Sequence, residues 1–103
     1  MTRTIRDFEG ARVRLEDERL LHILEDHPEL GGHDHLIDET LELPEKVVQS
    51  MSDRFVRLYY SDERAVLGKR LCVVVKKAGI DAFVLTAYVT DRVKKGAVVW
   101  QKT

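Results

Sequence analysis

Cysteine and long hydrophobic runs are scarce in this chain of 103 residues. Its one cysteine, Cys72, cannot form a disulfide within the chain or a cysteine-based metal site, and it fits a reducing, cytoplasmic location. The first ten residues are charged and lack an apolar core, so we expect no signal peptide. The longest apolar runs are too short to span a bilayer, and no membrane association is expected.

The sequence nevertheless has the composition of an ordinary small folded domain. Hydrophobic residues make up 44% of the chain and charged residues 34%, which is typical of globular rather than disordered proteins. We predict a single domain over residues 1–103, with residues 1–11 as a loose or edge segment at the N-terminus.

Charge is distributed unevenly between the two halves of the chain. Residues 1–53 carry 6 Lys and Arg against 14 Asp and Glu, whereas residues 54–103 carry 11 against 4. Such asymmetry is typical of proteins that bind a polyanion, although two halves that neutralise each other across the fold explain it equally well.

The stretch Ala82–Thr90 alternates strictly and predicts a central strand. Phe83, Leu85, Ala87 and Val89 are expected on a dry face, and Val84, Thr86, Tyr88 and Thr90 on the other. The remaining expected strands are short or apolar segments, at residues 12–15, 46–50, 55–61, 70–77 and 97–100.

Two helices are expected before most of these strands. The first begins near Asp17 and ends near His27, because Pro28 disfavours helical geometry in the residue before it. The second runs from about His33 to Leu43. This order predicts an α+β fold, with two N-terminal helices packed on a four- to five-stranded, mainly antiparallel sheet.

Four histidines lie within fourteen positions, at 22, 27, 33 and 35. Their spacing does not match a metal site, since His22 and His27 are too far apart to share one helix face, and we expect neither a metal nor another cofactor. Either of these two histidines could transfer a proton near neutral pH. A helix-capping role for His27 is an equally good interpretation.

Several polar residues could meet on an uncovered face of the sheet. Arg57 and Tyr59 share one strand face, Lys76 ends the apolar run of another strand, and Thr86 and Tyr88 share the hydroxyl face of the central strand. Cations, phenols and hydroxyls together suit an RNA phosphate and its bases. Arg92, Lys94 and Lys95 form a small basic patch that could contact a nucleic-acid backbone or be a solvated turn.

The segments Arg14–Leu30, Arg57–Tyr60, Val73–Lys76, Phe83–Thr90 and Lys94–Gly96 together resemble a known family. The most specific parts are H-I-L-x-x-H-P-E and T-A-Y-x-T. The chain is similar, from roughly Val13 to Trp100, to a phage-associated nuclease-like family in the barnase–EndoU–colicin–RelE-like group.

This resemblance implies a small metal-independent endoribonuclease of toxin or phage-defence type, which cleaves RNA by attack of the 2′-hydroxyl. The matching candidates for catalysis are His22 or His27, Lys76, Thr86 and Tyr88. An antitoxin or another protein partner is a corresponding expectation. The alternatives are a non-catalytic RNA- or protein-binding module, and a homo-oligomer formed through the polar sheet face or the final strand.

Overall fold

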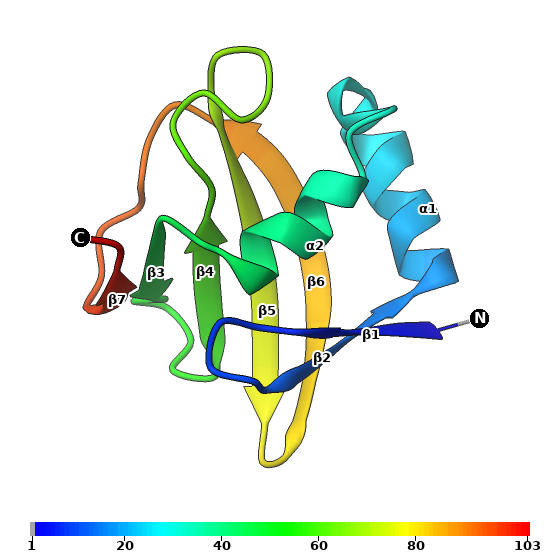
Figure 1. The fold of residues 1–103 in the computed structure, drawn as a ribbon. Helices are drawn as coiled ribbons and strands as arrows, with labels where there is room; N and C mark the ends of the chain where they lie inside the picture. Colours follow the sequence, from blue (N-terminus) through cyan, green and yellow to red (C-terminus); the bar gives the residue numbers. More distant parts are fainter. Residues whose placement is uncertain (1) are drawn as a thin grey trace.

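The computed structural model describes residues 2–103, which form two α-helices, a short 3₁₀ helix and seven strands (Figure 1). The elements are β1 (Thr2–Arg6), β2 (Arg12–Glu16), α1 (Asp17–Asp26), η1 (Pro28–Leu30), α2 (His35–Glu42), β3 (Lys46–Gln49), β4 (Val56–Tyr60), β5 (Arg70–Ala78), β6 (Asp81–Thr90) and β7 (Val98–Gln101). None of the described helices is long and apolar enough to cross a membrane.

All seven strands belong to one mixed sheet in the order β1-β2-β6-β5-β4-β3-β7. β2 and β6 are parallel and pair only at Arg14 and Phe83, whereas every other neighbouring pair is antiparallel. The expected four- to five-stranded, mainly antiparallel sheet under two N-terminal helices was therefore wrong. The α+β composition remains, but a β-hairpin precedes the helices and extends the sheet.

The additional strand, β1, lies in the segment that was expected to be loose or at an edge. Its residues read T-R-T-I-R, and only Ile5 among them is buried. One buried side chain gives no periodicity that a sequence can reveal. The strand is fixed instead by its antiparallel pairing with β2, from Thr2 opposite Glu16 to Arg6 opposite Arg12.

The two helices match the expected segments closely. Acidic Asp17 and Glu18 lie in the first turn of α1, where their negative charges interact favourably with the positive end of the helix dipole. The helix ends immediately before His27 and Pro28. α2 packs across β5 and β4. α1 packs against β6 and also contacts β2 (Figure 1).

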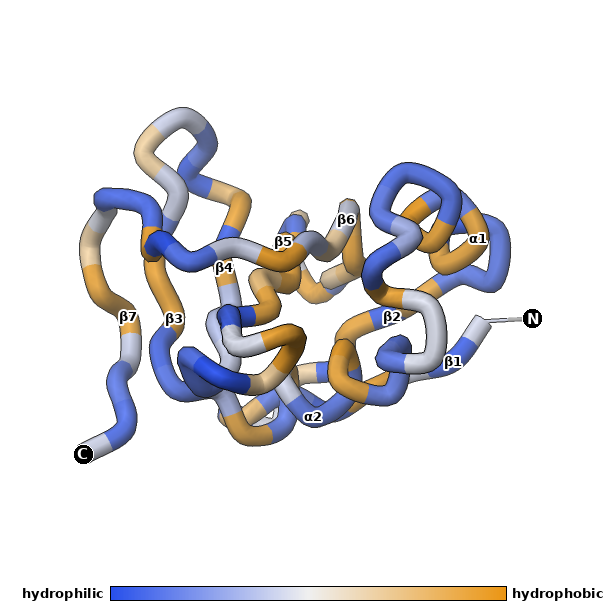
Figure 2. The backbone as a smooth tube through the Cα atoms, turned by 90° about the horizontal axis from the view of Figure 1, so that it is seen from above, coloured by the Kyte–Doolittle hydropathy of each residue, from blue (hydrophilic) through white to orange (hydrophobic). Residues whose placement is uncertain are grey.

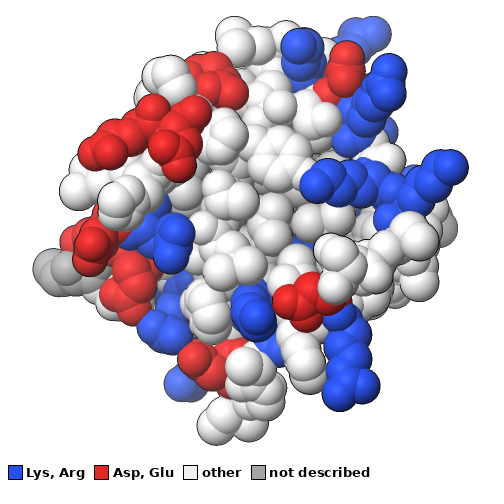
Figure 3. Space-filling view, turned by 180° about the vertical axis from the view of Figure 1, so that it is seen from behind, with Lys and Arg blue, Asp and Glu red and all other residues white. Residues whose placement is uncertain are grey.

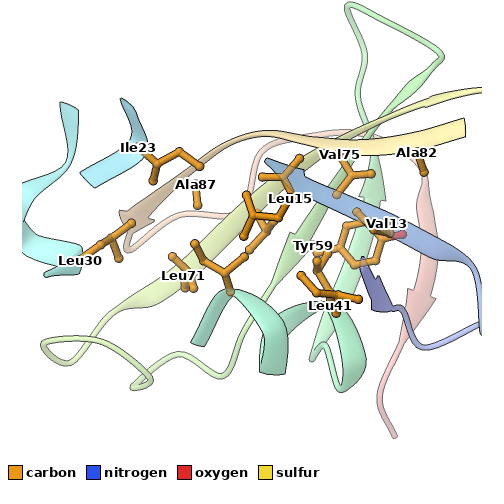
Figure 4. Close-up of a cluster of buried hydrophobic side chains, with 14 of the residues drawn as sticks. Val13, Leu15, Ile23, Leu30, Leu41, Tyr59, Leu71, Val75, Ala82 and Ala87 are labelled. Carbon is orange, nitrogen blue, oxygen red and sulfur yellow. The ribbon is translucent and has the colours of Figure 1, made fainter. Parts of the chain in front are cut away.

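The main core lies between the sheet and the helices. Leu30 and the buried side chains of α1 and α2 meet residues of β2, β4, β5 and β6, including Leu15, Tyr59, Leu71 and Ala87 (Figure 4). Hydrophobic segments follow these strands in the view from above, whereas most connecting loops are hydrophilic (Figure 2). We call this side of the sheet the covered face.

A second, smaller hydrophobic cluster lies on the other side of the sheet, which we call the open face. Its buried members are Val48, Val56, Leu58, Tyr60 and Cys72. Leu85, Tyr88 and Val93 pack against them and stay partly exposed. The sheet is therefore apolar on both sides, and burial alone does not distinguish the two faces.

A β-bulge at Leu85 interrupts the alternation of the central strand. Val74 pairs with Thr86 and Val75 pairs with Val84, which leaves Leu85 without a partner. Val84, Ala87 and Val89 consequently pack into the main core, while Leu85 and Tyr88 pack on the open face. The prediction of strict alternation was wrong at this point, because one inserted residue reverses the faces of the side chains before it.

Candidate nucleic-acid interface

The open face carries a groove of about 380 Å³ across β4, β5 and β6. It is lined by Ser50, Met51, Ser52, Val56, Leu58, Val74, Thr86, Tyr88, Lys94 and Lys95. Figure 3 views this side of the molecule and shows a largely uncharged centre, with several Lys and Arg at the upper right, Asp and Glu gathered over α1 at the upper left, and charges of both signs below. The groove therefore has an apolar floor and an unequal charge distribution around it.

The segment 91–97 brings two lysines to this groove and is attached to the sheet at two points. The backbone N–H of Lys94 donates to the hydroxyl oxygen of buried Tyr60 at 2.9 Å. Gly96 packs so closely on β3 that a Cβ atom there would overlap the carbonyl oxygen of Gln49 and the side chain of Val48. These contacts hold Lys94 and Lys95 at the rim of the groove.

The charges of Lys94 and Lys95 contrast with those of several basic residues that are paired with carboxylates. Neither forms an ion pair within residues 2–103, whereas Arg14, Arg57, Lys76 and Lys77 each lie within 4 Å of a carboxylate. An unpaired ammonium group beside an uncharged groove is available to an anionic ligand.

His27 and Lys94 approach the ring of Tyr88 from elements that are distant in sequence. The ring of His27, at the end of α1, has its centroid 6.2 Å from that of Tyr88. The Nζ atom of Lys94 lies 5.8 Å from the Tyr88 ring centroid. A titratable imidazole, an ammonium group and an aromatic ring thus meet at one end of the groove, which is a combination suited to RNA.

Below this point, Tyr60, Cys72 and Tyr88 form a poorly solvated cluster. Burial raises the pKa of Tyr60 to about 12 and that of the Cys72 thiol to about 11. Burial, followed by the neighbouring thiol, also raises the pKa of Tyr88. The hydroxyl of Tyr88 is buried and has no hydrogen-bond partner among the described residues. These groups are neutral at physiological pH, so the positive charge at this end of the groove is not cancelled from below.

Thr86 and Tyr88, expected on a polar face, line the groove together with Lys94 and Lys95. Arg92, from the same expected basic patch, is exposed and bonds through its backbone N–H to Thr90 Oγ1 at 3.1 Å, outside the groove lining.

Arg57 and Tyr59 lie on the covered face, not on the open one. Tyr59 is fully buried and its hydroxyl donates to Asp7 Oδ2 at 2.7 Å, and Arg57 Nη1 donates to Glu9 Oε1 at 3.0 Å. Burial and then Asp7 raise the pKa of Tyr59. The alternation of β4 was predicted correctly, but both sides of the strand are apolar and the sequence does not say which side the helices cover.

Two other predicted site residues do not line the groove. Lys76 lies near the open face, and His22 lies on α1. Lys76 Nζ is 3.4 Å from Asp53 Oδ2. His22 is exposed, 3.8 Å from Glu18 Oε1, and borders a separate concavity together with Glu16, Arg19 and Asp26. That concavity is mainly acidic and would repel a phosphate. The described residues contain no group of three or more His, Cys, Asp or Glu side chains that could hold a metal ion.

Sequence reasoning missed the roles of Tyr60, Cys72, Gly96 and the loop at residues 50–52. The alternation of β4 placed Tyr60 beside Val56 and Leu58, and this was the one available signal. The contact of Tyr60 with Lys94 spans 34 positions and depends on a loop whose path the sequence does not specify.

The chain was compared with protein-family models, with curated proteins and with solved structures, and none of the three comparisons gave a match.

Proposed function

We propose that the protein binds RNA on its open face and cleaves it without a metal ion. The supporting observation is the meeting of His27, Tyr88 and the unpaired Lys94 at one end of an uncharged groove. The lysines hold the phosphate, the groove with Tyr88 in its lining receives a base, and the imidazole of His27 transfers protons.

In the proposed reaction, neutral His27 accepts the proton of a ribose 2′-hydroxyl. The 2′-oxygen forms a bond to the adjacent phosphorus and the bond from phosphorus to the 5′-oxygen breaks. The proton passes from the imidazolium, directly or through water, to the departing oxygen. The products are a 2′,3′-cyclic phosphate and a 5′-hydroxyl, and Lys94 stabilises the charge on the phosphate during the exchange.

A cytoplasmic location and a protein partner that controls the activity belong to the same proposal. The free, buried thiol of Cys72 supports a reducing compartment. The partner would be an antitoxin-like protein, and the acidic side of α1 beside the groove gives it a surface that RNA does not compete for.

A non-catalytic RNA-binding module is the second candidate. One observation favours it: within the groove lining and its immediate neighbours, His27 is the one imidazole, and the ring of Tyr88 lies 6.2 Å away with its hydroxyl buried beneath the groove floor. This arrangement supplies one proton-transfer group where cleavage uses a base and an acid.

The test is to incubate the purified protein in EDTA with a panel of single-stranded and structured RNAs. We expect cleavage that His27→Ala slows by about 100- to 10,000-fold. His35→Ala, which removes an exposed imidazole from the start of α2, is the matched control and should cleave at the wild-type rate.

Each outcome selects between the candidates. Cleavage that survives His27→Ala would contradict the assigned role of His27. Binding without cleavage, weakening as salt rises, would establish the binding module instead. Absence of both would exclude a nucleic-acid function for the open face.

A further inference from the structure

Two segments that line the groove are held in place by the fold. The Tyr60 hydroxyl and the tight packing of Gly96 hold the segment that carries Lys94 and Lys95. The Gln49 side-chain amide donates to the carbonyl oxygens of Asp53 and Val56, at 3.2 and 2.9 Å, and closes the 50–55 loop. Both lining segments are therefore positioned before any ligand arrives.

The floor of the groove is mainly apolar. Val56, Leu58 and Val74 provide apolar surface from two adjacent strands, and Thr86 adds one hydroxyl. Ser50 and Ser52 add two more hydroxyls at the rim, and their Oγ atoms lie 3.1 Å apart. Such a surface suits a flat group with apolar faces and a polar edge, and a nucleobase has that form.

The volume of about 380 Å³ lies at the lower end of the range for small-ligand sites, about 300–1,000 Å³. The site is thus of a size for one small ligand rather than for a nucleic-acid duplex. In A-form RNA the bases are stacked inside the helix, and the deep, narrow major groove keeps side chains from reading them. A base can reach a recessed floor of this size only after it has left the stack.

Resting on the proposed RNA function, we propose that the groove holds one unpaired nucleotide. Its base lies on the floor formed by Val56, Leu58 and Val74, and its phosphate lies at Lys94 and Lys95. The protein consequently selects single-stranded RNA, loops and ends, and excludes duplex RNA.

The first experiment titrates the protein with each of the four ribonucleoside monophosphates and follows its methyl and amide NMR signals. Ribose 5-phosphate, which lacks a base, is the control ligand. We expect the nucleotides to shift the methyl signals of Val56, Leu58 and Val74, and ribose 5-phosphate to shift only the signals around Lys94 and Lys95. Equal shifts with and without a base would overturn the base site while leaving phosphate binding in place.

The second experiment compares one RNA sequence as a single strand, in a hairpin loop and in a blunt duplex. We expect the single strand and the loop to bind at least about tenfold more tightly than the duplex, because only they offer an unstacked base to the floor. Ser52 is exposed and lines the groove, so the larger side chain of Ser52→Trp should fill the groove and remove this preference. Thr4→Trp adds the same bulk on exposed β1 and should retain it.

The outcomes separate this inference from the proposed function. RNA that binds equally well as single strand and duplex, unaffected by Ser52→Trp, would overturn the nucleotide site and keep the RNA function. A loss of preference in both Trp variants would also count against the groove. If no RNA binds in any form, both proposals are wrong.

Discussion

Both faces of the sheet are apolar, but their polar groups differ in whether they have hydrogen-bond and ion-pair partners. On the covered face, the buried carboxylate of Asp7 accepts hydrogen bonds from the Tyr59 hydroxyl and from the backbone N–H groups of Glu9 and Ala11. Lys77 lies 3.7 Å from the same carboxylate. On the open face, the Tyr88 hydroxyl has no hydrogen-bond partner among residues 2–103. Lys94 and Lys95 form no ion pair within these residues, whereas nearby Lys76 pairs with Asp53.

Under the proposed function, this difference is one between structural and ligand-binding polar groups. A buried polar group that is fully hydrogen-bonded stabilises the fold, whereas one without a partner costs stability. We therefore expect substitutions of the polar groups on the covered face to change stability, and substitutions of Lys94 and Lys95 on the open face to change RNA binding.

The largest expected change in stability is for Asp7→Ala. It leaves the Tyr59 hydroxyl and two backbone N–H groups without an acceptor and removes one of the two carboxylate partners of Lys77, so we expect a loss of about 3 kcal/mol in the free energy of unfolding. Urea unfolding at pH 7 measures it. Glu9→Ala, a half-exposed acid of the same cluster, is the control and should cost less than about 1 kcal/mol. Equal losses in the two variants would show that the buried carboxylate has no special role.

The converse substitution is Lys94→Gln combined with Lys95→Gln. Two lost phosphate contacts should reduce the salt dependence of single-stranded RNA binding by about 1.4 in the slope of log K against log salt. The free energy of unfolding should change by less than about 0.5 kcal/mol. Lys69→Gln with Lys102→Gln removes the same charge from exposed positions outside the groove, and it should leave the slope unchanged. A slope that falls equally in both double variants would indicate only a general effect of net charge.

Stability at alkaline pH should depend on the open face, because three groups with raised pKa values, Tyr60, Cys72 and Tyr88, lie there. Cys72 and Tyr60 have folded-state pKa values of about 11 and about 12, above their ordinary values. When the folded pKa is raised, stability is complete below the unfolded pKa and is lost as pH rises toward the folded one. We expect the free energy of unfolding to fall between about pH 8.5 and pH 12.

Tyr60→Phe tests this by removing one of the titrating groups. The decline in stability with pH should become shallower, even though the variant loses its hydrogen bond to Lys94 and is less stable at pH 7. Urea unfolding at pH 7, 9, 10 and 11 gives both quantities. A decline as steep as that of the wild type would show that Tyr60 does not contribute to it.

The smallest effect should come from the exposed ion pair that joins β2 to the β5–β6 hairpin. Arg14 contacts Asp81 through two hydrogen bonds, at 3.0 and 2.9 Å, and these lower the pKa of that carboxyl. A lowered pKa gives stability that is present at neutral pH and is lost as pH falls through the folded pKa. Arg14→Gln should lower the Tm by about 2 °C at pH 7, and by less at pH 2.5. A difference that persists in acid would assign the effect to packing over Phe83 instead.

Periodicity predicted the helices and most strands of this fold, because each shows its pattern within a few residues. It could not predict β1, which buries Ile5 alone, or the parallel contact between Arg14 and Phe83, which joins residues 69 positions apart. It also could not assign faces in a sheet that is apolar on both sides. Thr86, Tyr88, Lys94 and Lys95 were selected from sequence and lie together, whereas Arg57 and Tyr59 lie on the covered face.

The bulge at Leu85 has a consequence for how the chain tolerates changes in length. Leu85 is the one residue of β6 that has no partner on β5, and the side chains on either side of it already face correctly. Deleting Leu85 should therefore shorten and straighten the strand and leave each remaining side chain on its present face. Deleting Ala87 instead would exchange the faces of the residues on one side of it and place Tyr88 in the core. The strand can lose a residue at one position without losing the chemistry of either face.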